Sequence, residues 1–354
     1  MKKIFITTFL VSAISSCLQA QNKDLKINQI QVIGSHNSYR QAIETDLYNT
    51  IQAKAPNRSL QGLEYNHINI TEQLNMGLRN LEIDIYVDTK GGKYAHPKGL
   101  DIAKSTQAYD PTGIMKRPGF KVFHMPDIDF RSSCLTFSIC LQELKKWSDA
   151  NPDHVPVFIT LEPKDGEASF LGTKPEDFTA TQFDAMDAII RQELGDDKLI
   201  TPDRVRGKYA TLEEAVLHNN WPSLKEAQGK FLFILDNNGA KRDLYILNHP
   251  SLKGRAIFVN AEPGTAEAAT LFKNNPEDAS IPDLIKKGYL VRTRADADTK
   301  EARNNDYSHF EDAKKSGAQI ITTDYYLPSK FFESTYHIKF DDSTYVRENP
   351  VNGK

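Results

Sequence analysis

The chain has 354 residues and a formal net charge of −3 at neutral pH. This length is sufficient for one large domain or two ordinary ones. No stretch rich in Lys and Arg stands out, which argues against nucleic acid as a partner. Beyond the N-terminal region the sequence has no second long apolar run, so it predicts no transmembrane helix.

The first twenty residues have the pattern of an export signal. Lys2 and Lys3 precede an apolar stretch over residues 4–16 that is too short to span a bilayer. We favour cleavage after Ala20; the alternative is a lipoprotein that begins at a lipidated Cys17. Either form of the signal predicts that the mature chain is exported, to the periplasm or out of the cell. We expect residues 21–354 to form a single domain.

Strand and helix patterns alternate along the rest of the chain. Apolar runs predict strands at residues 30–33, 81–88, 120–124, 155–161, 231–235, 256–259, 289–292 and 319–322. Amphipathic patterns predict helices at residues 71–78, 138–150 and 181–194, from 211, at 281–287, and through 302 and 313 to Gly317. Eight strands with helices between most of them favour an α/β fold of the (β/α)8 TIM-barrel type; an open, doubly wound sheet is the alternative. We expect the tail from about residue 329 to pack on the barrel.

The strand at residues 81–88 alternates apolar and acidic residues, which places Glu82 and Asp84 on the same face. Adjacent carboxylates repel each other and resist burial. A bound hard cation, calcium or magnesium, would relieve this repulsion, because such ions prefer oxygen ligands. The alternative is a solvated strand face, which the buried character of the neighbouring strands disfavours.

Cys134 and Cys140 are the two cysteines that remain once the signal is removed. Export to an oxidising compartment favours a disulfide between them; two buried free thiols are the alternative. The short loop would contribute only about 2 kcal/mol by the chain-entropy estimate. A zinc site is disfavoured, because no further cysteine is present to complete it.

Polar residues follow the predicted strands at their C-terminal ends, and the C-terminal rim is where barrel enzymes carry their active sites. They are His36, Asn37, His124, Glu162, Asp236, Arg292 and Asp324. The motifs H-E-x-x-H and G-x-S-x-G are absent, as is a Gly-rich phosphate loop. Two His beside an oxygen-rich metal site fit phosphodiester cleavage, with one His as base, the other as acid, and the cation offsetting charge on the phosphoryl oxygens.

Four motifs, in order along the chain, resemble the calcium-dependent phosphoinositide-specific phospholipase C family in its secreted bacterial form. They are Gly-Ser-His-Asn-Ser-Tyr (34–39), Leu-Glu-Ile-Asp (81–84), Phe-His (123–124) and Thr-Leu-Glu-Pro-Lys (160–164). The Cys134/Cys140 pair, followed by Leu141 and Trp147, fits the same branch. The resemblance runs from about residue 30 to 326 and is specific in the first half. It implies a distorted TIM barrel that cleaves phosphatidylinositol or a related phosphoinositide and releases diacylglycerol.

The resemblance also implies roles for individual residues. His36 is similar to the residue that assists attack by the inositol 2-hydroxyl, and His124 to the second catalytic His, which faces the leaving group. The implied Ca2+ ligands are Asn37, Glu82, Asp84 and Glu162. Lys164, Asp236, Arg292 and Tyr325 are weaker matches to residues that bind the inositol or its phosphates.

Two other functions stay open at this point. A glycerophosphodiester phosphodiesterase on the same barrel would carry His-Arg after the first strand, where this chain has His36 and Asn37. A non-catalytic protein that binds lipid or sugar is disfavoured, because both His and all the acids are present. The sequence contains no separate membrane-binding module. We therefore expect a monomer that meets phospholipid head groups at a membrane surface through rim loops such as residues 94–120.

Overall fold

The computed structural model describes residues 25–353, apart from residues 58, 105 and 106. The predicted signal peptide, its cleavage site and Cys17 lie outside the described residues. No helix in the described part of the chain is both long and apolar enough to span a membrane.

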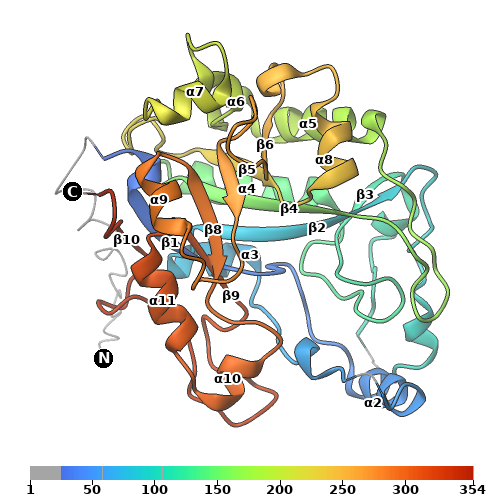
Figure 1. The fold of residues 1–354 in the computed structure, drawn as a ribbon. Helices are drawn as coiled ribbons and strands as arrows, with labels where there is room; N and C mark the ends of the chain where they lie inside the picture. The colour runs from blue at the N-terminus through green and yellow to red at the C-terminus, as the bar shows by residue number, and fades with distance from the viewer. Residues whose placement is uncertain (1–24, 58, 105–106, 354) are drawn as a thin grey trace, which may run out of the picture.

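Eight parallel strands form a nearly closed barrel (Figure 1). They are β1 (Ile30–Ser35), β2 (Asn80–Asp88), β4 (Val157–Lys164), β5 (Phe231–Leu235), β6 (Ile257–Val259), β7 (Thr270–Phe272), β8 (Leu290–Arg294) and β9 (Ile320–Thr323). Their spatial order is β6-β5-β4-β2-β1-β9-β8-β7. The two ends of this ribbon meet at one parallel bridge, between Asn260 and Thr270. The predicted TIM barrel is confirmed.

Most helices lie around the barrel (Figure 1). They are α3 (Ile70–Met76), α4 (Phe137–Ala150), α5 (Ala180–Leu194), α6 (Pro202–Arg206), α7 (Leu212–Leu217), α8 (Gly239–Ile246), α9 (Ile281–Lys286), α10 (Lys300–Asn304) and α11 (Ser308–Ser316). The exception is α2 (Thr45–Lys54), which lies away from the strands and packs against Ile128 and Phe130. Short 3-10 turns lie at η1 (Ile27–Gln29), η2 (Gln61–Leu63), η3 (Lys98–Asp101), η4 (Ile114–Lys116), η5 (Asp196–Lys198) and η6 (Pro250–Leu252). Because helices cover their outer faces, strands such as β5 are apolar and buried at every position.

Local sequence sets where several of these elements begin. Asn69 and Thr136 accept hydrogen bonds from the first-turn amides of α3 and α4, as N-cap residues do. Gly34 lets β1 approach β2 closely, because a Cβ at this position would lie 2.4 Å from Asn80. This close approach brings the segment after β1 against β2, where Ser38 and Glu82 exchange two hydrogen bonds.

The prediction that residues 120–124 form a strand of the barrel is wrong. The structure has β3 (Gly119–Lys121) there, paired antiparallel with the outer end of β2. The eighth barrel strand is instead β7, which is only three residues long and gave no recognisable apolar run. Likewise, the helix predicted through residues 302 and 313 is divided, because Asn305 takes a left-handed conformation (φ 50°) between α10 and α11.

The C-terminal tail packs on the barrel. Its strand β10 (Val346–Glu348) pairs antiparallel with β1. Tyr336, Ile338 and Phe340 are buried in a cluster with Ile33 of β1 and Ile321 of β9. The tail therefore supports the strands that carry the polar residues of the rim.

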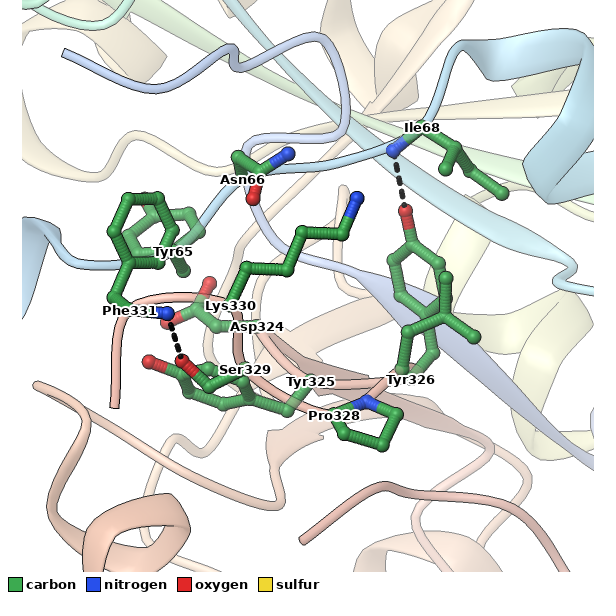
Figure 2. A pocket seen from close by; sticks show the side chains of 11 residues that line it. Tyr65, Asn66, Ile68, Asp324, Tyr325, Tyr326, Pro328, Ser329, Lys330 and Phe331 are labelled. Atoms are coloured by element: carbon green, nitrogen blue, oxygen red, sulfur yellow. Dashed lines mark hydrogen bonds between the residues drawn. The ribbon is translucent and has the colours of Figure 1, made fainter. Parts of the chain in front are cut away.

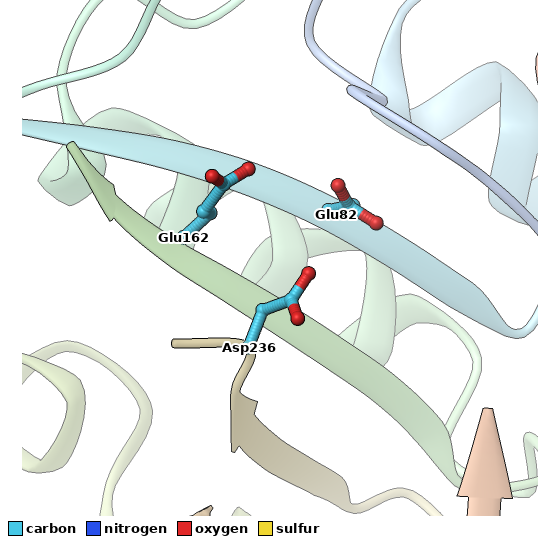
Figure 3. Close-up of side chains that lie close together, drawn as sticks. All are labelled: Glu82, Glu162 and Asp236. Atoms are coloured by element: carbon cyan, nitrogen blue, oxygen red, sulfur yellow. The ribbon is translucent and has the colours of Figure 1, made fainter. Parts of the chain in front are cut away.

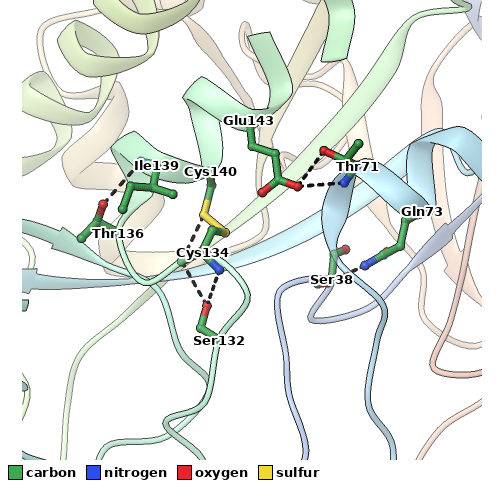
Figure 4. The surroundings of a disulfide bond; sticks show 9 residues. All are labelled: Ser38, Thr71, Gln73, Ser132, Cys134, Thr136, Ile139, Cys140 and Glu143. Carbon is green, nitrogen blue, oxygen red and sulfur yellow. Dashed lines mark hydrogen bonds between the residues drawn. A yellow bond between two sulfur atoms is a disulfide. The ribbon is translucent and has the colours of Figure 1, made fainter. Parts of the chain in front are cut away.

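Cys134 and Cys140 form the predicted disulfide (Figure 4). It joins the first turn of α4 to the segment that precedes it. Nearby, Glu143 of α4 accepts hydrogen bonds from the amide and hydroxyl of Thr71 in α3. The disulfide and this contact fix the segment that follows His124.

Candidate functional site

His36 lies directly after β1, on the C-terminal rim of the barrel. Its Nδ1 is 2.8 Å from Oδ1 of Asp324, which follows β9, and its Nε2 is 3.5 Å from Oε1 of Glu82. The Asp324 amide donates to the buried Asp296, so this carboxylate is itself held in place. Burial, followed by the positive charge of Arg294, keeps the pKa of His36 well below its usual value. A neutral imidazole held by a carboxylate at Nδ1 is suited to accept a proton at Nε2.

His124 has a corresponding carboxylate partner. Its Nδ1 is 2.7 Å from Oδ2 of the fully buried Asp129, and the same oxygen is 2.6 Å from Nε of Arg40. Burial raises the pKa of Asp129, but Arg40 and His124 together more than offset this and hold it below its usual value. Tyr86 of β2 donates to the His124 carbonyl, which fixes the backbone. This leaves Nε2 of His124 with no hydrogen-bond partner among the described residues.

Both His residues lie beside β2. Nε2 of His36 is 3.5 Å from Glu82 of this strand, and Tyr86 of the same strand donates to the His124 carbonyl. The two predicted His residues are therefore anchored on the strand that also carries Glu82 and Asp84.

Carboxylates from three neighbouring strands converge beside the His residues (Figure 3). Glu82 lies on β2, Glu162 on β4, and Asp236 directly after β5, and one oxygen of each lies within 4.8 Å of the others. Asp84 is adjacent, because it pairs with Glu162 across the β2–β4 ladder. Both Asp84 oxygens are buried without a hydrogen bond, and burial raises the pKa of this carboxyl well above its usual value.

Two basic residues from the predicted substrate-binding set lie among these acids. Arg292 of β8 is 2.7 Å from Oε2 of Glu82. Lys164, at the end of β4, is 2.7 Å from Oε1 of Glu162 and 3.3 Å from Oδ2 of Asp84. Burial raises the pKa of Glu162, but the positive charges around it, that of Lys164 foremost, more than offset this and lower the pKa. With all four carboxylates ionised, the two cations leave two negative charges, which one divalent ion would balance.

Asn37 follows His36 in a left-handed conformation (φ 48°). Its carboxamide oxygen accepts a hydrogen bond from Tyr39, and its nitrogen donates to Tyr65. Asn37 is 1% exposed, so these two hydrogen bonds hold its side chain in a buried position at the rim. An amide oxygen at this position is the kind of neutral ligand that calcium accepts.

A polar pocket of about 530 Å3 extends from the acid cluster across the ends of β4 to β7. It is lined by Glu162, Asp236, Asn237, Asn238, Ala240, Lys241, Asn260, Phe272 and Asn274. The Asn237 oxygen is buried without a hydrogen-bond partner among the described residues. Lys241 is engaged by Asp165 (2.7 Å) and the Pro163 carbonyl (2.8 Å). The lining thus offers amides, carboxylates and one aromatic ring.

Tyr325 follows Asp324, the partner of His36, and lines a small pocket together with Tyr65, Asn66 and residues 327–331 (Figure 2). The side chain is buried, its hydroxyl donates to the Glu64 carbonyl, and its ring packs on Phe332 and Tyr336. It thus lies in an aromatic cluster and leaves little surface for a ligand.

Sequence reasoning missed Arg40, Asp129 and Arg294. Asp129 is five residues after His124 in a turn, a spacing with no periodic pattern. Arg40 and Arg294 meet their partners only through the fold. The position of Asp324 after the last strand marked it as a rim residue, but the sequence could not predict its contact with His36.

Comparisons with known proteins bear on this arrangement. The family model described as "Phosphoinositide phospholipase C, Ca2+-dependent" matches residues 25–350. Among solved structures, the calcium-dependent phosphoinositol-specific phospholipase C of a Pseudomonas species has 14% sequence identity and a TM-score of 0.56, with 95% of this chain and 100% of that chain covered. The corresponding enzyme of Streptomyces antibioticus has 19% identity and a TM-score of 0.53, covering 85% and 95% of the two chains. A search of curated proteins found no match.

Proposed function

Since the family match covers nearly the whole chain, the protein belongs to the Ca2+-dependent phosphoinositide phospholipases C, and from this membership we propose that it cleaves the phosphodiester of phosphatidylinositol. The chain is thus a phosphodiester-cleaving enzyme, and Ca2+ is the metal of its family. The observation that carries the specific proposal is the convergence of two carboxylate-held His residues with an acid cluster on one rim.

The chemistry divides between the two imidazoles. Neutral His36 takes the proton from the inositol 2-hydroxyl, whose oxygen attacks phosphorus. The bond from phosphorus to the diacylglycerol oxygen breaks, and His124 gives that oxygen a proton from Nε2. The products are inositol 1,2-cyclic phosphate and diacylglycerol. Asp324 and Asp129 orient the rings through Nδ1 and favour the tautomers and charges that these transfers need.

The acid cluster fits a hard divalent cation. Both Asp84 oxygens are buried without a hydrogen bond, and Oδ2 has the Lys164 ammonium at 3.3 Å. With all four carboxylates ionised, Lys164 and Arg292 leave the cluster with two negative charges. Asn37, Glu82, Asp84 and Glu162 would hold the ion, and we add Asp236, whose carboxylate lies with Glu82 and Glu162. When bound, Ca2+ lowers the pKa of the attacking hydroxyl and offsets charge on the phosphoryl oxygens.

The polar pocket accommodates the head group. Its amides suit the hydroxyls of an inositol ring, and Phe272 offers the ring an apolar face. The one lysine among its lining residues is already paired with Asp165, so no free cation awaits an extra ring phosphate. This lining favours the unphosphorylated ring over its polyphosphorylated forms, with Lys164 and Arg292 close enough to contact the reacting phosphate.

We also propose that the protein is exported and acts as a monomer at the surface of a phospholipid membrane. The disulfide supports an oxidising compartment. Phosphatidylinositol is a membrane lipid, so the rim must approach a bilayer.

The test is turnover of phosphatidylinositol with and without a chelator, with the products identified by phosphorus NMR. We expect a cyclic phosphodiester to appear only with calcium. Cleavage of glycerophosphodiesters in preference to phosphatidylinositol, or lipid binding without turnover, would contradict the proposal.

A further inference from the structure

A third histidine, His67, lies beside His36 and contacts its backbone. It belongs to the segment between η2 and α3 and is 2% exposed. Its Nε2 is 2.7 Å from the carbonyl oxygen of His36. A carbonyl oxygen can only accept a hydrogen bond, so Nε2 of His67 carries the proton and donates it. The ring of His67 is therefore attached to the main chain of the residue assigned as the base.

The other nitrogen of the His67 ring indicates that the imidazole is neutral. Nδ1 is buried without a hydrogen-bond partner among the described residues. A proton on this nitrogen would be an unpaired buried donor, which costs free energy. Burial accordingly lowers the pKa of His67 to about 4. The hydrogen bond from Nε2 to the His36 carbonyl is thus the same throughout the neutral pH range.

Aromatic packing and backbone contacts fix the direction in which Nε2 points. The His67 ring stacks on Tyr326, with 5.2 Å between ring centroids, and lies tilted against Tyr65 at 5.5 Å. The His67 amide donates to the Arg40 carbonyl (3.0 Å). The next amide, that of Ile68, donates to the Tyr326 hydroxyl (Figure 2). The donor is therefore held before any ligand binds.

The carbonyl that His67 holds belongs to the peptide between His36 and Asn37. No backbone amide of the described residues donates to this oxygen. Asn37 has a left-handed conformation (φ 48°), which is sparsely populated by residues with a side chain. Its carboxamide nitrogen donates to the Tyr65 hydroxyl (2.8 Å), two residues before His67. The segment 65–67 thus holds this peptide on one side and the Asn37 side chain on the other.

The rest of the turn is held by other elements. The Ser38 amide donates to the Glu82 carbonyl of β2, and Gln73 of α3 donates to the Ser38 carbonyl (2.7 Å, Figure 4). These contacts fix the chain after Asn37. They leave the orientation of the preceding peptide to His67.

We propose that His67 is a positioning residue whose Nε2–H orients the His36–Asn37 peptide, so that the His36 imidazole and the Asn37 carboxamide face the site together. The plane of this peptide sets ψ of His36 and φ of Asn37, so its rotation would turn both side chains. This inference rests on the proposed function, in which His36 takes a proton and Asn37 holds the metal. It gives one buried hydrogen bond control over both tasks.

Two substitutions separate the hydrogen bond from the packing of the ring. His67→Phe keeps an aromatic ring against Tyr326 and removes the donor, whereas His67→Gln loses the ring and keeps an N–H donor. We expect His67→Phe to lower kcat on phosphatidylinositol by at least about tenfold, because a small displacement of a reacting group is costly. KM should change less than kcat. Calcium affinity, measured by isothermal titration calorimetry, should fall as well, and His67→Gln should recover most of both losses.

His154→Phe is the matched control. His154 is also a buried histidine with a pKa lowered to about 4, and its ring packs on Trp147 at 4.7 Å between centroids. It precedes β4, at the end of the barrel opposite the rim. We expect His154→Phe to lower the melting temperature and to leave kcat and calcium affinity unchanged.

An unchanged kcat in His67→Phe would overturn the proposal. Losses in His67→Gln equal to those in His67→Phe would do the same, because they would reduce His67 to a packing role. If His67→Phe does not fold, nitrogen-15 NMR of the histidine side chains in the unmodified protein decides. A neutral His67 ring protonated at Nε2 supports the proposal, and a proton on Nδ1 overturns it.

The two levels of inference fail in different ways. Absence of phosphatidylinositol cleavage by the unmodified protein refutes the proposed function. The protonated nitrogen of His67, and the calcium affinities of His67→Phe and His67→Gln, still decide whether His67 positions the peptide.

Discussion

His124 and Arg40 contact the same carboxylate oxygen, Oδ2 of Asp129, at 2.7 and 2.6 Å. Asp129 and Arg40 are fully buried, so this carboxylate is ionised only because its charge is compensated. The arrangement makes Asp129 a positioning residue for His124 and explains why the His124 ring presents Nε2 to the site.

We predict that Asp129→Asn lowers kcat by at least about tenfold, because an amide cannot fix the tautomer or stabilise the protonated ring. KM should change less than kcat, and the acidic limb of the pH–rate profile should shift. Asp101→Asn is the control, since Asp101 makes a 2.8 Å contact with His96 on the exposed surface. An unchanged pH profile in Asp129→Asn would contradict this role.

His36→Ala and His124→Ala should each lower turnover by about 100-fold or more, the usual contribution of a general acid or base. Their melting temperatures should stay near that of the unmodified protein, since both rings are on the rim. Steady-state assays with phosphatidylinositol measure the effect. Near-full activity in either variant would remove that residue from the mechanism.

Calcium should stabilise the fold by mass action, because the acid cluster is assembled only in the folded chain. A chelator should abolish activity and lower the melting temperature; calcium should restore both, and magnesium should do so poorly. Glu82→Gln and Asp236→Asn should blunt the calcium-dependent shift, whereas Glu277→Gln on the exposed surface should not. Full activity in excess chelator, with no calcium-dependent melting shift, would refute the metal site.

Lys164 should weaken metal binding, because its ammonium occupies oxygens of Glu162 and Asp84. We predict that Lys164→Met tightens calcium binding by about tenfold, as expected when a competing charge within 4 Å is removed. Isothermal titration calorimetry measures this directly. Lys241→Met is the matched control, because Lys241 pairs with Asp165 and not with the cluster. Weaker calcium binding in Lys164→Met would show that the ammonium does not compete with the ion.

His154 should make the stability depend on pH. Burial lowers its pKa to about 4 in the folded chain, while its ring contacts Ser148 and the Val155 carbonyl. The unfolded chain binds the proton below about pH 6.5, so stability is fully present above that pH and falls toward pH 4, by up to about 1.4 kcal/mol per pH unit.

The measurement is urea unfolding between pH 4.5 and 7. His154→Gln should flatten part of the slope, and His67, whose pKa is also lowered to about 4, should account for another part. His218→Gln, on an exposed ring, should leave the slope unchanged. A slope that is identical in His154→Gln and the unmodified protein would contradict the prediction.

Periodicity and strand-end position predicted most of the barrel and brought His36, Glu82, Asp84, Glu162 and Asp236 to one rim. These signals are local in sequence: alternation along β2, and polar residues that follow apolar runs. They failed at β7, which is too short for a period, and at β3, where an apolar run pairs antiparallel at the edge of β2.

The partners of the two His residues required the fold. His36 meets Asp324 across 288 positions, and Arg40 meets Asp129 across 89. The amides of the polar pocket are also scattered, from Asn237 to Asn274, and the adjacency of β5, β6 and β7 brings them together.

A single bridge joins β6 to β7, so strand pairing in the barrel is weakest there, and the polar pocket lies across this junction. Asn237 stands on one side of this junction and Asn274 on the other, and the Asn260–Thr270 bridge lies between them. An inositol ring that binds to both sides would link β5 and β7 across the junction where the pairing between barrel strands is weakest. Occupancy of the pocket would then slow local opening between β6 and β7 before it measurably raises the free energy of unfolding of the whole domain.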